Sequence, residues 1–124
     1  MLRGNDLPFV RDRFQTALEL LDSETPDVAG PLEEVIRING LSISFGSKHL
    51  RFLRPDKCPV LDSVIGSGLG YPESTAGYRL YAADCQEVCE KLLSNGIVNP
   101  SRRKEGRWFA ADVDMALFAF LQGF

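Results

Sequence analysis

The chain has 124 residues, of which 44% are hydrophobic and 25% are charged, and its formal net charge is −3 at pH 7. This composition is typical of one globular domain and excludes a chain that is disordered throughout. The negative charge excludes a global positive field, so binding to nucleic acid would need a local basic patch. No apolar run has the length of a membrane span, and residues 1–13 lack a signal-peptide core. We therefore expect no membrane partner and a cytoplasmic location.

The first two predicted elements are helices. Apolar residues recur at steps of three and four after Pro8, which suits the first turn of a helix. They are Val10, Phe14, Ala17, Leu18 and Leu21. A second, short helix is expected after the Gly30-Pro31 pair, with Leu32, Val35 and Ile36 as its apolar stripe.

The next segment departs from helical spacing. Leu41, Ile43 and Phe45 alternate with serines, which predicts either a brief strand or an extended buried turn. Gly46 permits a tight turn, and a helix is expected after it. Lys48 would lie in the first turn of that helix, where the helix dipole and partial desolvation favour the neutral, nucleophilic amine.

Asp62 follows the apolar run Pro59-Val60-Leu61 and precedes a helical or turn segment over residues 63–65. A carboxylate at the start of a helix can cap the backbone amides or stabilise a developing cation. Both interpretations remain open for Asp62. For Lys48, the alternative to a nucleophile is a solvated lysine at the end of a helix.

The clearest helix is expected over residues 74–95, and Gly96 is typical of a left-handed helix stop. Its predicted inward-facing residues are Tyr78, Tyr81, Cys85, Val88, Cys89 and Leu92. A last helix over residues 112–122 is apolar nearly all round, so it either lies in the centre of the core or is covered by a partner chain. Capping and the helix dipole suffice to explain Asp112 and Asp114. We therefore predict an all-α fold, a compact orthogonal bundle of five to six helices in a single domain over residues 1–124.

The three cysteines make an odd count, which fits a reducing compartment better than a disulfide framework. Cys85 and Cys89 share one face of the predicted long helix. Together with His49 and Cys58 they allow a zinc site to be drawn, but core packing is the interpretation that we favour. We expect neither a metal nor a cofactor, since no four-cysteine iron–sulfur pattern is present.

Residues 33–70 resemble part of the helix-hairpin-helix DNA glycosylases, in particular the lysine-bearing, 8-oxoguanine DNA glycosylase-like branch. Those proteins have a Gly-hydrophobic-Gly-x-Lys turn between two helices, followed by a helix and an apolar Pro-Val-Asp step. Ser44-Phe45-Gly46-Ser47-Lys48 is similar to that turn, and Pro59-Val60-Leu61-Asp62 is similar to that step. Ser44 stands at the first glycine, and the chain is shorter than those enzymes, as in a short or degenerate member.

The resemblance implies a helix-hairpin-helix-like turn near residues 41–50 and a role for each matched residue. Lys48 would attack the sugar C1′ and form a Schiff base, and Asp62 would support departure of the base and the cationic sugar. Amides near Gly46 would hold a phosphate of double-stranded DNA. Ser47 and His49 flank Lys48 and are included among the expected DNA-binding residues.

Two basic clusters are candidates for a phosphate-binding face. The first contains Lys48, Arg51, Arg54 and Lys57, and the second contains Arg102, Arg103, Lys104 and Arg107. The alternative is that both are ordinary surface charges. Two classes of function therefore remain open. One is a DNA base-excision glycosylase and lyase, or a DNA-binding relative. The other is a non-enzymatic interaction module that forms a homo-oligomer through its apolar C-terminal helix.

Overall fold

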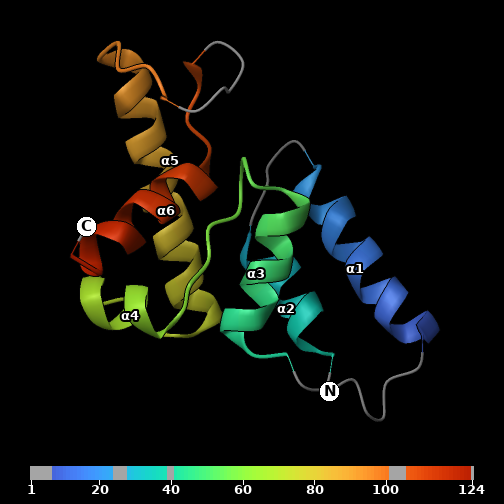
Figure 1. Cartoon of the computed structure of the whole chain (residues 1–124). Coiled ribbons are helices and arrows are strands. Elements are labelled where there is room, and N and C mark those ends of the chain that lie inside the picture. Colours follow the sequence, from blue (N-terminus) through green and yellow to red (C-terminus); the bar gives the residue numbers. More distant parts are fainter. Residues whose placement is uncertain (1–6, 24–27, 39–40, 101–105, 124) are drawn as a thin grey trace.

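The computed structural model describes residues 7–23, 28–38, 41–100 and 106–123. These residues form six helices and no strand, which confirms the predicted all-α bundle (Figure 1). The helices are α1 (Leu7–Leu21), α2 (Ala29–Ile36), α3 (Ile43–Leu53), α4 (Ser63–Leu69), α5 (Thr75–Ser94) and α6 (Ala110–Leu121). None of them is long and apolar enough to cross a membrane.

The helices form two groups, with α2 packed against both α1 and α3, and α6 packed against both α4 and α5. Helix α2 also contacts α5, and residues 54–62 run between the groups from α3 to α4 (Figure 1). All six helices contribute buried side chains to one core, among them Leu21, Leu32, Leu50, Ile65, Tyr78 and Val113. The core therefore extends across both groups.

Helix α5 agrees closely with the prediction. The Ser74 side chain caps it by accepting a hydrogen bond of 3.0 Å from the Gly77 amide, and Gly96 follows its end at a left-handed φ of 71°. Tyr78, Tyr81, Cys85 and Cys89 are buried as predicted. Val88 was predicted to face inward but is 40% exposed, so the prediction is wrong at this residue.

Helix α6 lies at the surface, so its predicted place in the centre of the core is wrong. Its inner side buries Ala110 and Val113, whereas the side chain of Phe120 is 72% exposed. A helix with apolar residues on every side can bury only the side that meets its neighbours, here α4 and α5. The other sequence-based alternative, cover by a partner chain, stays a prediction.

Helix α3 begins at Ile43, so the predicted strand is wrong, and the helix-hairpin-helix-like turn expected near residues 41–50 does not extend over residues 43–50. Ser42 caps α3, with its Oγ accepting a hydrogen bond of 3.3 Å from the Phe45 amide. Within α3, Gly46, Ser47 and Leu50 are buried at helical spacing. A helix forms in spite of the two-residue alternation, because it places these buried residues on one face that packs against α2.

Candidate functional site

Lys48 projects from the exposed side of α3. It lies in the second turn of the helix and not in the first turn, as the sequence predicted. Phe45, Lys48, His49 and Phe52 follow one another at helical spacing, and all four are exposed. The Lys48 Nζ lies 5.3 Å from the centroid of the Phe45 ring, within the range of a cation–π contact.

Gly46 serves helix packing. Its amide donates a 2.7 Å hydrogen bond to the Ser42 carbonyl within the helix, and phosphate binding by amides near Gly46 stays a prediction. A Cβ at this position would lie 2.9 Å from Cγ2 of Ile36 and 3.1 Å from Cδ1 of Leu32. Glycine is therefore required here by the close approach of α3 to α2.

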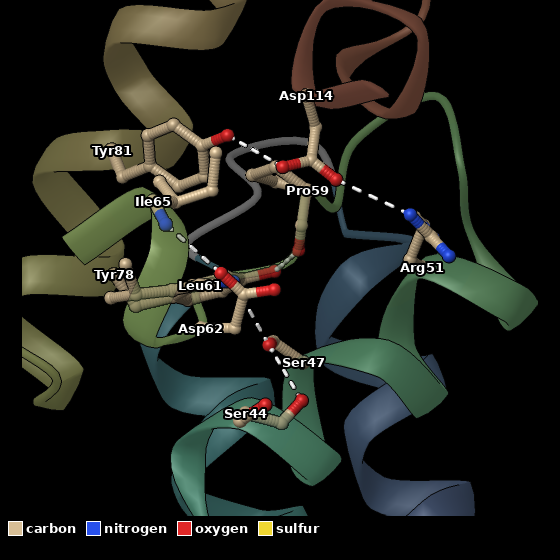
Figure 2. Close-up of polar contacts among 10 residues, drawn as sticks. All are labelled: Ser44, Ser47, Arg51, Pro59, Leu61, Asp62, Ile65, Tyr78, Tyr81 and Asp114. Carbon is tan, nitrogen blue, oxygen red and sulfur yellow. Dashed lines mark hydrogen bonds and ion pairs between the residues drawn. The ribbon is translucent and has the colours of Figure 1, made fainter. Parts of the chain in front are cut away.

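Ser47 brings the two matched segments together. Its Oγ donates a 3.1 Å hydrogen bond to the Ser44 carbonyl and accepts one of 3.1 Å from the amide of Leu61 (Figure 2). The Tyr78 hydroxyl donates to the Pro59 carbonyl at 2.9 Å and fixes the other end of the same run. The residues that follow Ser47 and Leu61 in the chain are the two candidate catalytic residues, Lys48 and Asp62.

Asp62 is the N-cap of α4. Its Oδ1 accepts a 3.0 Å hydrogen bond from the Ile65 amide, which confirms the capping interpretation. The side chain is half-buried, and Figure 2 shows the carboxylate between α4 and the Ser47 region of α3. A cap uses one oxygen of a carboxylate, and each oxygen can accept more than one hydrogen bond, so capping leaves Asp62 able to meet a cation as well.

An apolar groove of about 510 Å³ lies beside Lys48. It is lined by Phe14, Leu18, Lys48, His49, Phe52 and Leu53, which come from α1 and α3. The His49 Nδ1–H donates a 2.7 Å hydrogen bond to the Phe45 carbonyl, and its ring lies 5.7 Å from that of Phe14. Phe52 is 88% exposed, so a large aromatic surface faces solvent at the mouth of the groove. Among these six lining residues, Lys48 is the one that carries a primary amine.

A buried carboxylate that sequence reasoning missed, that of Asp114, pairs with Arg51 of α3. Asp114 is 3% exposed, with Oδ1 accepting a hydrogen bond of 2.6 Å from the Tyr81 hydroxyl and Oδ2 lying 3.3 Å from Arg51 Nη1 (Figure 2). The expectation that capping explains Asp114 is wrong, although Asp112 does accept a hydrogen bond from the Phe109 amide. One sequence signal was available, because Asp114 shares a helix face with Ala110 and Leu117, which would place it toward the core.

The structure describes the first basic cluster but only Arg107 of the second. Arg51 pairs with Asp114, and Arg54 pairs with Asp22 at 2.8 Å, so both guanidinium groups already have a carboxylate partner. Arg102, Arg103 and Lys104 lie outside the described residues. Phosphate binding by the two clusters together therefore stays a prediction.

The cysteines pack in the core, as predicted. Cys58, Cys85 and Cys89 are buried and free. Burial raises the pKa of the Cys58 and Cys85 thiols to about 12, which disfavours the thiolate that a zinc ligand requires. Within the described part of the chain, no group of histidine, cysteine and acidic residues is arranged to hold a metal ion.

Comparisons of the chain with protein families, with curated proteins and with solved structures found no match.

Proposed function

We propose that this protein binds DNA and acts on a damaged nucleotide through Lys48 and Asp62, in the manner of a glycosylase with lyase activity. The observation that carries the proposal is the 3.1 Å hydrogen bond from the Leu61 amide to Ser47 Oγ. It joins the two segments that resemble the glycosylase motifs, and Lys48 and Asp62 are each the next residue in the chain after one of its two partners. The adjacent apolar groove offers aromatic surface for a planar base that has left the duplex stack.

The proposed reaction uses each residue once. The neutral amine of Lys48 forms a bond to C1′ of the sugar while the glycosidic C1′–N bond breaks, and the base leaves with that electron pair and takes up a proton. The nitrogen then loses a proton, its electron pair forms the C1′=N bond of the Schiff base as the C1′–O4′ bond breaks, and O4′ takes up a proton. The carboxylate of Asp62 stabilises the positive charge that develops on the sugar.

Borohydride trapping on duplexes that contain 8-oxoguanine or an abasic site tests this chemistry. We expect the wild type to form a covalent complex, because borohydride reduces a Schiff base to a stable amine. Lys48→Gln should abolish that complex while leaving the thermal melting curve unchanged, since an exposed lysine contributes little to stability. Lys91→Gln is the matched control, because Lys91 is exposed on α5 and pairs with Glu87 at 3.2 Å.

Asp62→Asn separates catalysis from capping within the same assay. Asparagine caps a helix about as well as aspartate, so the fold should be retained. Base release should nevertheless slow by about two orders of magnitude or more, because the charge that stabilises the cationic sugar is gone. A wild type that forms no trapped complex on either lesion, or an Asp62→Asn variant of full activity, would contradict the proposed function.

Exposed apolar residues on α6 support a second candidate, self-association as an interaction module. Phe120 is 72% and Met115 is 61% exposed, and the two acidic residues of the helix are directed elsewhere, Asp112 to the Phe109 amide and Asp114 into the core. The exposed part of α6 therefore carries no charge that would repel a second copy of itself. A second copy is the partner that we propose for it.

Sedimentation velocity across a concentration series tests self-association. We expect the wild type to form a dimer and Phe120→Ser to shift it toward the monomer, because burial of one phenylalanine contributes about 1.5–3 kcal/mol. Phe52→Ser is the control, since Phe52 is also an exposed phenylalanine but belongs to α3. A wild type that stays monomeric at every concentration would exclude this candidate.

A further inference from the structure

The three residues before Asp62 lie in a buried segment that has no regular secondary structure. Residues 58–61 are buried and belong to no helix. Backbone amides and carbonyls in such a segment need partners from elsewhere in the chain, because an unpaired buried polar group is costly. Each of the three residues obtains one, and each partner lies on a different helix. The partners are Tyr78 of α5 for Pro59, Asp114 of α6 for Val60, and Ser47 of α3 for Leu61.

Asp114 contacts both of the segments that carry the candidate catalytic residues. Its carboxylate accepts a hydrogen bond from the amide of Val60, which stands two residues before Asp62. The same carboxylate lies 3.3 Å from Nη1 of Arg51, which stands three residues after Lys48 on α3 (Figure 2). Because Asp114 is 3% exposed, little water competes for its oxygens, and hydrogen bonds in such surroundings are stronger than in water.

We propose that Asp114 is a positioning residue for Asp62, an inference that rests on the function proposed above. Through the Val60 amide it fixes the segment that ends at Asp62. Through Arg51 it ties that segment to α3, the helix that carries Lys48. Its own carboxylate is buried and paired, so it touches neither the sugar nor the base. Placement of this kind matters for rate, because a shift of about 1 Å in a reacting group can cost about a hundredfold.

Tyr81 allows positioning to be separated from stability. Its hydroxyl donates a 2.6 Å hydrogen bond to Oδ1 of Asp114, but it belongs to α5, which carries neither candidate catalytic residue (Figure 2). Tyr81→Phe therefore removes one buried hydrogen bond from Asp114 and leaves its contacts with Arg51 and Val60 in place. Asp114→Ala removes all three contacts. Both variants should lose stability, and only Asp114→Ala should release the segment before Asp62.

Amide hydrogen exchange, followed by nuclear magnetic resonance, tests this placement without DNA. We expect the Val60 and Leu61 amides of the wild type to be protected, since both donate to buried side chains. Asp114→Ala should raise both exchange rates about tenfold or more relative to the amides of α2, as expected for the loss of a hydrogen bond to a charged group. Tyr81→Phe should raise all of these rates together. An unprotected Val60 amide in the wild type, or equal changes in the two variants, would overturn the proposal.

The trapping reaction of the proposed function tests the catalytic consequence. At saturating DNA, and at a temperature where the variants remain folded, Asp114→Ala should slow formation of the trapped complex about tenfold or more, with the Kd for DNA unchanged. Tyr81→Phe should form the complex at the rate of the wild type. Equal slowing in both variants would mean that Asp114 serves stability alone and would overturn the proposal. A wild type that forms no trapped complex contradicts the proposed function instead, and the exchange experiment then decides whether Asp114 holds the segment.

Discussion

Asp114→Ala should lower the free energy of unfolding by about 3 kcal/mol, because it removes the acceptor that several buried groups share. The hydroxyl of Tyr81, a residue that is 1% exposed, and the Val60 amide both donate to this carboxylate. A buried donor left without an acceptor costs about 1–3 kcal/mol. Arg51 adds less, since its side chain is 37% exposed and can turn toward water. Urea unfolding followed by circular dichroism measures the loss.

Arg51→Gln is the matched control for the Asp114 experiment. It removes the partly exposed member of the ion pair and leaves Tyr81 and Val60 with their acceptor, so we expect a loss of less than about 1 kcal/mol. If Asp114→Ala costs no more than Arg51→Gln, the buried hydrogen bonds to Asp114 contribute no net stability.

The pH dependence of stability gives an independent measure of the same carboxylate. Burial raises the pKa of Asp114 above its usual value of 3.8, and the hydrogen bonds from Tyr81 and Val60 and the charge of Arg51 only partly oppose this. The stabilisation from the proton is therefore fully present below the unfolded pKa and is lost as the pH rises through the folded pKa. We expect the free energy of unfolding of the wild type, relative to that of Asp114→Asn, to fall as the pH rises above about 3.8.

Gly77→Ala should destabilise the protein by about 3 kcal/mol or more. A Cβ at this position would lie 1.9 Å from the carbonyl oxygen of Pro72, which is a backbone atom and cannot rotate away. The start of α5 would have to shift, and the Ser74 cap on the Gly77 amide would be disturbed with it. The gain of about 1 kcal/mol in helix propensity is too small to offset this. Thermal and urea unfolding measure the result.

Gly30→Ala is the control for Gly77, because it makes the same chemical change in a helix that has room for it. The nearest side-chain atom, Cδ1 of Leu20, lies at 3.8 Å from the added Cβ, which is an ordinary contact. We expect unchanged stability or a gain of up to about 1 kcal/mol. Equal effects at the two positions would mean that the start of α5 relaxes without cost.

Several features of this fold were determined by the sequence itself. The apolar spacing of residues 75–94 and the Ser74 and Gly96 boundaries predicted α5 almost to the residue. Asp62 was predicted as a possible helix cap and is one. These features depend on contacts within a few residues along the chain, where helix periodicity and capping hydrogen bonds act, so the local sequence is sufficient to predict them.

Other features were decided only by the tertiary structure. The alternation of Leu41, Ile43 and Phe45 is compatible with a strand, and packing of Gly46 against α2 selected a helix instead. The burial of Asp114 depends on Tyr81 and Arg51, which lie 33 and 63 residues away in the chain. A cleft lined by Val28, Asp56, Gln86 and Trp108 likewise joins four segments that are far apart in sequence. A buried polar group is stable only when distant residues supply its partners, and no local pattern specifies where those residues meet.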